Sequence, residues 1–215
     1  MKKFPVRLAS WEDIERWTRE GAWKVLEEGW RPDVIVSLAR GGWVPARLYC
    51  DYLGVKDLVS LKIEHWGITA TPDGKAKLRY GSDYKLQGKR VLIVDDISDT
   101  GESLTLAKNY VENQNPTGVK TATLLTIKGS RFRPDYYAES IEWAWIVFPW
   151  NFVEDMINLV NNILGEKETA STDEIVELLW ELHGIDVPKG KLEEALRMAE
   201  RRKIFKFREG KWRRV

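Results

Sequence analysis

The clearest pattern in this sequence is the stretch Val91-Leu92-Ile93-Val94-Asp95-Asp96-Ile97-Ser98-Asp99-Thr100-Gly101-Glu102-Ser103. Its first four residues are apolar, as in a strand buried on both faces, and two adjacent carboxylates follow where this strand should end. A loop of small residues comes next, and a helical pattern begins directly after it. Phosphates bind at helix N-termini, and ligands of open α/β sheets bind beyond the carboxyl ends of strands. The stretch therefore predicts an anion site, although an acidic pair merely solvated at a strand end is the simpler alternative.

Composition places the chain among soluble globular proteins. Of its 215 residues, 43% are hydrophobic and 31% are charged. The net charge of +1 argues against nucleic-acid binding by bulk electrostatics. The single cysteine, Cys50, excludes an intramolecular disulfide, and its apolar helical context favours a buried small hydrophobe over a nucleophile. Because no segment approaches the ~20 apolar residues of a membrane span and no apolar signal region opens the chain, we expect a cytoplasmic protein without a membrane partner.

A second unit of strand, glycine loop and helix precedes the first one. The β-branched run Val34–Leu38 predicts a buried strand, and Ala39-Arg40-Gly41-Gly42 follows it. Adjacent glycines let backbone amides approach an anion closely, and Arg40 adds a positive charge, although such a turn is more often only tight. Further strands are expected at 58–64, 119–127 and 141–147. This alternation predicts an α/β fold with a mostly parallel sheet flanked by helices.

A long polar stretch from His65 to Lys89 interrupts the alternation. Its basic residues, of which Lys77 and Arg79 are the candidates for ligand contact, are compatible with a lid over an anionic ligand. A solvated β-hairpin is about equally compatible with the pattern.

The last ~50 residues differ in character from the rest of the chain. Two helices are expected, one capped by Thr172 and one starting near Lys189, and a β-hairpin is expected around Glu209-Gly210. Because this order is the outline of a winged helix, we predict a main domain at 1–165 and a small α+β winged-helix-like unit at 166–215.

The C-terminal tail is basic, with eight Lys or Arg against one acid from Arg201 to Val215. Such a tail can meet nucleic-acid phosphates. The whole of 166–215, however, has twelve basic and eleven acidic residues, so dimer contacts or packing against the core rank ahead of nucleic acid.

The stretch 91–103 resembles the phosphoribosyl-diphosphate (PRPP) binding motif of type I phosphoribosyltransferases, in which an apolar strand and two acids precede Asp-Thr-Gly and a hydroxyl residue. The resemblance covers roughly residues 30–155 and implies a PRPP-dependent transfer that releases pyrophosphate. It implies that Asp95 and Asp96 face the ribose hydroxyls and Mg²⁺. It also identifies 39–42 as the pyrophosphate loop and 65–87 as the flexible catalytic loop. The implied PRPP-binding residues are Ala39, Arg40, Gly41, Gly42, Asp95, Asp96, Asp99, Thr100, Gly101, Glu102 and Ser103.

The chemistry of such a transfer gives two of these residues catalytic roles. Displacement at the ribose C1 passes through an oxocarbenium-like state, so the leaving pyrophosphate must be neutralised and water excluded. Arg40 is the expected cation beside the pyrophosphate. Asp99 lies between the sugar carboxylates and the phosphate loop, where it can exchange a proton with the purine N7.

A third signal concerns the base. Lys128 and the segment Trp143–Trp150 are similar to the purine pocket of 6-oxopurine phosphoribosyltransferases of the xanthine–guanine type. The resemblance implies that Lys128 meets the exocyclic O6 and that Trp145 and Ile146 contact the ring. Hypoxanthine, guanine or xanthine is then favoured, because an ammonium donor prefers a carbonyl acceptor. Adenine stays open, since some archaeal adenine-specific enzymes share the outline, and core packing is the simpler alternative for the tryptophans.

Two positions depart from the family pattern. Glu102 stands where relatives often carry Lys, Gly or Arg, and Asn151 stands where many carry a carboxylate. The expected function is a homodimeric, Mg²⁺-dependent purine phosphoribosyltransferase of purine salvage. The alternative is a transcriptional regulator that senses PRPP or a purine nucleotide and binds DNA through its C-terminal wing.

Overall fold

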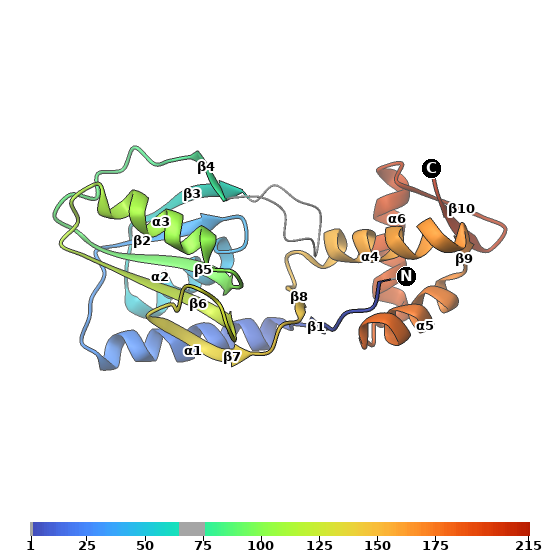
Figure 1. The fold of residues 1–215 in the computed structure, drawn as a ribbon, viewed down its shortest axis with the longest axis horizontal. Coiled ribbons are helices and arrows are strands. Elements are labelled where there is room, and N and C mark those ends of the chain that lie inside the picture. Colours follow the sequence, from blue (N-terminus) through green and yellow to red (C-terminus); the bar gives the residue numbers. More distant parts are fainter. Residues whose placement is uncertain (1, 65–75) are drawn as a thin grey trace. The chain divides into compact units, whose positions relative to one another are not determined.

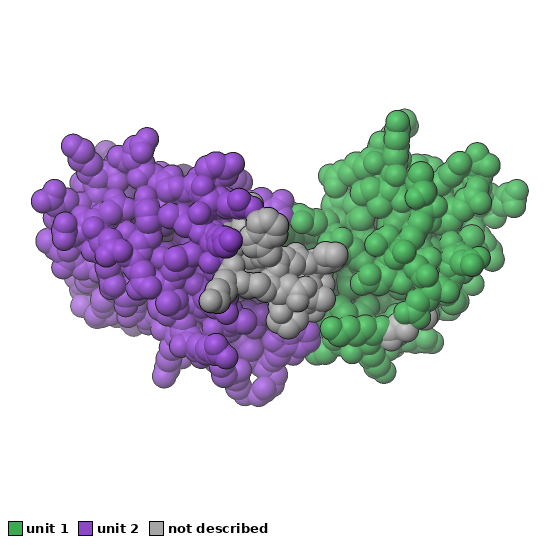
Figure 2. Space-filling model, turned by 45° about the horizontal axis from the view of Figure 1, so that its top comes forward, with its two compact units in different colours: residues 1–10, 144–215 green, residues 11–143 purple. Residues whose placement is uncertain are grey.

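The computed structural model describes residues 2–64 and 76–215 (Figure 1). It divides into two compact units, which Figure 2 colours separately. One unit comprises Trp11–Trp143, and the other combines the N-terminal segment up to Ser10 with Ala144–Val215. Of the long polar stretch at 65–89, residues 65–75 lie outside the described part. Within the described ranges, every helix is too short or too polar to cross a bilayer.

The Trp11–Trp143 unit is built on a six-stranded sheet with the order β4-β3-β2-β5-β6-β7. Neighbouring strands are parallel except β3 and β4, which are antiparallel. The predicted α/β fold with a mostly parallel sheet is confirmed. The strands are β2 (Val34–Ala39), β3 (Leu58–Glu64), β4 (Lys77–Tyr80), β5 (Arg90–Ser98), β6 (Gly118–Ile127) and β7 (Tyr136–Ile141).

Helices cover both faces of this sheet (Figure 1). The helices are α1 (Trp11–Glu27), α2 (Trp43–Leu53) and α3 (Glu102–Glu112). On one face, Leu104 and Val111 of α3 join a cluster with the odd-numbered residues Val91 and Ile93 of β5. On the other face, α1 and α2 pack against the even-numbered Leu92. Because β5 is enclosed on both sides, its apolar residues form a continuous run instead of alternating with polar ones.

One predicted strand is wrong. The run 141–147 was expected to be a single strand, but β7 ends at Ile141 and β8 (Trp145–Val147) begins after a break. β8 leaves the six-stranded sheet and pairs in parallel with β1 (Val6–Leu8), with Val6 opposite Trp145. The run therefore contributes to two strands that belong to different sheets, and its local sequence pattern does not indicate this division.

The other unit continues from β8 into three helices and a small antiparallel sheet (Figure 1). Its strands have the order β10-β11-β9. A capping box at Ser171 and Glu174 starts α5, as the sequence indicated within one residue. Position 165 lies within α4, so the domain division at 165/166 stays a prediction. The elements are α4 (Phe152–Lys167), β9 (Thr169–Ala170), α5 (Thr172–His183), α6 (Lys189–Arg201), β10 (Phe205–Arg208) and β11 (Lys211–Arg214).

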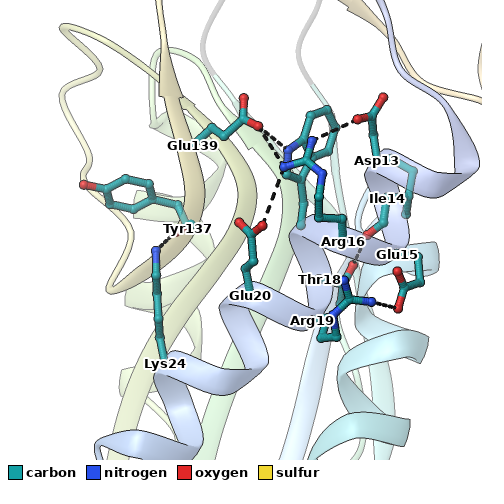
Figure 3. A network of polar contacts seen from close by, with 11 residues as sticks. Asp13, Ile14, Glu15, Arg16, Thr18, Arg19, Glu20, Lys24, Tyr137 and Glu139 are labelled. Atoms are coloured by element: carbon teal, nitrogen blue, oxygen red, sulfur yellow. Dashed lines mark hydrogen bonds and ion pairs between the residues drawn. The ribbon is translucent and has the colours of Figure 1, made fainter.

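Polar contacts attach α1 to β7, the edge strand of the larger sheet (Figure 3). Arg16 contacts the carboxylates of Asp13 at 2.9 Å, Glu139 at 3.2 Å and Glu20 at 3.6 Å. The side chain of Trp17 is fully buried, and its Nε1 donates to Glu139 Oε1 at 2.7 Å. Glu139 therefore accepts from both Arg16 and Trp17, and it is the carboxylate on which the attachment of α1 depends.

We expect Glu139→Ala to lower the free energy of unfolding by about 1–3 kcal/mol, because it removes the acceptor of a buried indole N–H. Glu20→Ala is the matched control. It removes only a longer contact of Arg16 with an exposed carboxylate, which is worth less than about 1 kcal/mol. Urea unfolding followed by tryptophan fluorescence measures both changes. Equal losses in the two variants would contradict a special role for the Trp17 contact.

Candidate functional site

The glycine loop after β2 lies against the acidic pair of β5. β2 and β5 are adjacent and parallel, with Ser37 opposite Val94, so their carboxyl ends emerge side by side. A Cβ placed on Gly41 would lie 2.0 Å from Asp96 Oδ2, and one on Gly42 would lie 2.4 Å from the carbonyl oxygen of Val94. A side chain at 42 would collide with backbone, so glycine is required there, and a side chain at 41 would displace the Asp96 carboxylate. The structure thus brings two of the predicted site segments into direct contact.

The loop itself is tight. The Gly42 amide donates to Leu38 O at 2.9 Å and the Trp43 amide donates to Arg40 O at 3.2 Å, so the chain turns directly from β2 into α2. The peptide bond between Ala39 and Arg40 is cis. The Arg40 side chain is exposed. A cation with its backbone fixed in this way stands at the carboxyl edge of the sheet, where the sequence predicted it.

Asp95 and Asp96 are adjacent carboxylates that repel each other when both are ionised. The Asp96 amide donates to Asp95 Oδ1 at 3.0 Å, and the Ile97 amide donates to Asp96 Oδ1 at 2.8 Å. Burial, followed by the charge of Asp96, raises the pKa of Asp95 well above its ordinary value. A bound cation would relieve this repulsion, because it compensates the negative charge that the two carboxylates share.

Carboxylate oxygens of this kind suit Mg²⁺, which is usually held by one or two carboxylates together with substrate phosphates and waters. In the described residues no group of three or more acidic, histidine or cysteine side chains gathers that would hold a metal unaided. The Asp95–Asp96 pair therefore fits a metal that is shared with a substrate.

The small-residue loop opens helix α3 as predicted. Asp99 and Thr100 are exposed, and Gly101 is the N-cap with φ +84°, a left-handed conformation that favours glycine. The Thr105 amide and hydroxyl both bond to the Gly101 carbonyl, at 3.0 Å and 2.9 Å. The amides of the first turn and the helix dipole make this end of α3 favourable for an anion.

The segment after β6 supports this loop. A Cβ on Gly101 would lie 2.3 Å from the Phe132 Cβ, and the Arg131 amide donates to Thr100 O at 3.3 Å. Ser98 Oγ donates to Phe132 O at 2.9 Å. Phe132 and Ser98 are therefore positioning residues that the sequence analysis missed. The only local signal was an aromatic residue just after β6, the strand beside β5.

The candidates in the long polar stretch are partly described. Lys77 and Arg79 lie exposed on β4, which pairs antiparallel with β3. This is the geometry of the hairpin alternative. The remainder of the expected lid, 65–75, lies outside the described residues, so contact of these cations with a ligand stays a prediction.

The predicted base-binding residues belong to different compact units. Lys128 follows β6, and its Nζ is 2.7 Å from Glu142 Oε1, with both side chains exposed. In the other unit, Trp145 Nε1 donates at 3.0 Å to Oδ1 of Asp155, a carboxylate of α4 that is only 3% exposed, while Ile146 is buried. Glu142 and Asp155 are further residues that the sequence analysis missed. Nothing in the local pattern pairs them with Lys128 and Trp145.

Comparison with known proteins gives consistent matches. Residues 7–155 match the family model described as the phosphoribosyl transferase domain. A hypoxanthine-guanine phosphoribosyltransferase from Schizosaccharomyces pombe is 27% identical, over 68% of this chain and 89% of that protein. The structure of a purine phosphoribosyltransferase from Pyrococcus horikoshii has a TM-score of 0.60 and 32% identity, over 67% of this chain and 93% of that chain. A Helicobacter pylori xanthine-guanine-hypoxanthine phosphoribosyltransferase has a TM-score of 0.59 over 67% of this chain and 93% of its own, and at 19% identity it shows the fold alone.

We expect Gly101→Ala to lower the free energy of unfolding by about 2–4 kcal/mol, since it adds left-handed strain to a collision with Phe132. Gly129→Ala is the matched control, because Gly129 has φ +87° but nothing lies within 4 Å of its added Cβ. The control should lose only the strain, about 1–2 kcal/mol. Urea titrations of both variants measure the difference. If the two losses are equal, the Phe132 contact does not support the loop.

Proposed function

This chain belongs to the family of phosphoribosyl transferase domains, and from that premise we propose that it transfers the 5-phosphoribosyl group of PRPP to a purine base in purine salvage. The observation that carries the proposal is the contact of Gly41 with Asp96. It joins an anion-binding glycine loop to an acidic pair at one edge of the sheet, and the helix end after Asp99 follows directly. The glycine loop suits the pyrophosphate, the acidic pair suits the ribose hydroxyls, and the helix end suits the 5′-phosphate.

Each segment receives one part of PRPP. Asp95 and Asp96 accept hydrogen bonds from the ribose 2′ and 3′ hydroxyls. The first turn of α3, with the hydroxyls of Thr100 and Ser103, holds the 5′-phosphate. The amides of the 39–42 loop and the Arg40 guanidinium hold the pyrophosphate, with Lys77 and Arg79 as further candidates.

Mg²⁺ would be held by Asp95 and Asp96 together with substrate oxygens. When bound, it supplies positive charge that stabilises the leaving pyrophosphate. The chain's own residues do the rest. They hold the sugar and the phosphate in line for displacement, and they exclude water from an oxocarbenium-like C1.

Asp99 is the proposed proton carrier. It is exposed at the start of the phosphate loop and follows Asp96, the second sugar carboxylate, by three residues. The bond from C1 to pyrophosphate breaks while the bond from C1 to the purine nitrogen forms. The proton that the purine releases is taken up at the carboxylate of Asp99.

Base selection is assigned to Lys128, Trp145 and Ile146. The Lys128 ammonium, which Glu142 contacts in the described structure, donates to an exocyclic O6, so 6-oxopurines are favoured and adenine is disfavoured. Trp145 is fixed by Asp155 and supplies ring contact. Hypoxanthine, guanine and xanthine are the proposed substrates.

The C-terminal part is proposed to be a winged helix. Its elements run helix, strand, helix, helix, strand, strand from α4 to β11, and the last strand lies between the other two. This arrangement needs α4 as its first helix. The proposed unit therefore follows the compact division at Ala144 more closely than the predicted boundary at 165/166.

Self-association is proposed through the exposed tryptophans of α1 and α2. Trp11, Trp23 and Trp43 are each more than half exposed, at 57%, 58% and 52%. Large exposed aromatics are typical of interfaces, and a homodimer is the simplest closed assembly. The proposed location is the cytoplasm, where a buried free thiol such as that of Cys50 is ordinary.

A base panel tests the function. With PRPP and Mg²⁺, we expect hypoxanthine, guanine or xanthine to release pyrophosphate faster than adenine. Lys128→Met should lower kcat/KM for these bases by about 10- to 100-fold, because a charged hydrogen bond is lost, and should change adenine little. Lys56→Met, which alters an exposed lysine outside all the proposed site segments, is the control. Absence of pyrophosphate release with every base would refute the enzyme and leave the PRPP-sensing regulator.

Asp99→Asn tests the proton carrier. We expect kcat to fall by about 100-fold or more while the affinity for PRPP changes little, because the amide keeps the shape but cannot take up a proton. Asp51→Asn, at an exposed acid of α2, should leave both quantities unchanged. Steady-state kinetics together with a PRPP binding titration separate the two effects, and an unchanged kcat in Asp99→Asn would remove Asp99 from the mechanism.

A further inference from the structure

The hairpin of β10 and β11 carries four cations on one face. In its antiparallel register Lys206 is opposite Arg213, and Arg208 is opposite Lys211. Side chains alternate between the two faces of a strand, so these four residues share one face. The other face carries Phe205 and Trp212, both buried at 1% exposure. The burial of the apolar side of the hairpin thus directs the four cations toward the opposite side.

This arrangement opposes like charges directly, which destabilises a β-ladder. Arg208, Lys211 and Arg213 are exposed and Lys206 is half-buried. In the part of the chain that the structure describes, none of the four forms an ion pair. The pKa of Glu174 is lowered mainly by hydrogen bonds with Ser171. The charge of Lys211 makes a smaller contribution to this lowering, without an ion-pair contact.

Three other basic residues of the same unit have partners. Lys189 pairs with Asp173 at 2.6 Å, Arg197 pairs with Glu200 at 2.9 Å, and Arg214 donates to the Asn161 carbonyl at 2.9 Å. The hairpin face differs from these positions because it gathers four cations side by side, none of which forms an ion pair among the described residues. Four cations held close together against their mutual repulsion indicate a polyanionic partner.

We propose that this face binds the phosphate backbone of a nucleic-acid duplex. The four cations lie in two rows that are about 4.8 Å apart, with about 6.7 Å between successive cations in a row. Such spacing meets several phosphates at once, as the wing of a winged helix can. The inference concerns a surface apart from the proposed transfer site and does not depend on it.

Two other occupants fit this face less well. A second copy of the chain, docked through the same face by two-fold symmetry, would set cations against cations. An anionic membrane surface favours several apolar side chains beside the basic ones. Of the large exposed apolar residues described in this unit, Trp180 and Met198 lie on α5 and α6, and Val215 alone adjoins the hairpin.

The test variant is the full chain with Lys206→Gln, Arg208→Gln, Lys211→Gln and Arg213→Gln. Since the change relieves repulsion and leaves Phe205 and Trp212 in place, its thermal midpoint should equal or exceed that of the unmodified chain. The matched control also loses two lysines and two arginines at exposed positions in the other unit. Its substitutions are Arg31→Gln, Arg47→Gln, Lys56→Gln and Lys85→Gln.

Fluorescence anisotropy with a DNA duplex of about 20 base pairs, roughly two helical turns, measures binding between about 50 and 200 mM salt. For the unmodified chain, we expect log K to fall linearly with log salt. Each lost phosphate contact reduces that slope by about 0.9, so the hairpin variant should lose about 3 to 4 and the control nothing. Pyrophosphate release by the hairpin variant should match that of the unmodified chain, which separates this test from the proposed transferase function.

Three outcomes would overturn the proposal. The first is the absence of salt-dependent duplex binding by the unmodified chain. The second is a hairpin variant that keeps the full slope. The third is tighter binding to vesicles that contain phosphatidylserine than to the duplex, which would make the partner a membrane surface.

Discussion

The contact on which the candidate site depends is the approach of the Gly41 backbone to the Asp96 carboxylate. It is possible because β2 and β5 are parallel neighbours, so that the loop after one strand meets the acids in the last part of the other. It also explains the residue choice at 41, since any side chain would displace the carboxylate. Burial and, after it, the charge of Asp96 raise the pKa of Asp95, so keeping both carboxylates ionised is costly. A cation and a substrate that bind at this edge together would lower the cost of keeping both carboxylates ionised.

The rest of the Trp11–Trp143 unit serves to hold this edge. Helices on both faces bury residues 91–94 of β5, and α3 begins directly after the loop that follows this strand. Phe132, from the segment after β6, fills the space that Gly101 leaves open. Three adjacent strands therefore each deliver one loop to the same place. This is the arrangement in which an open α/β sheet binds ligands, and the sheet supplies rigidity while the loops supply chemistry.

Local pattern was enough to predict the alternating fold, the glycine loop and the helix after Gly101, because each rests on residues close in sequence. The acidic pair was expected where the strand ends, but β5 continues to Ser98 through pairing with β6, so Asp95 and Asp96 lie within the strand. Contacts between distant residues were beyond it. The pairing of Trp17 with Glu139, of Lys128 with Glu142 and of Trp145 with Asp155 depends on which strands and helices become neighbours. The split of the run 141–147 has the same origin, since the second part leaves for β1. The roles of the site residues toward PRPP and the base remain predictions.

The pairing of β1 with β8 has a consequence for how the protein is made. Val6 to Leu8 leave the ribosome early, whereas their partners Trp145 to Val147 are synthesised only after the whole of the Trp11–Trp143 unit. During synthesis, β1 therefore has no partner strand until residues 145–147 have been made. Domains generally fold as their sequences emerge, and a unit assembled from both ends of a chain cannot do so. This unit is therefore completed late in biosynthesis. Because residues 11–143 separate its two segments in the sequence, no single truncation of the chain yields this unit without the other.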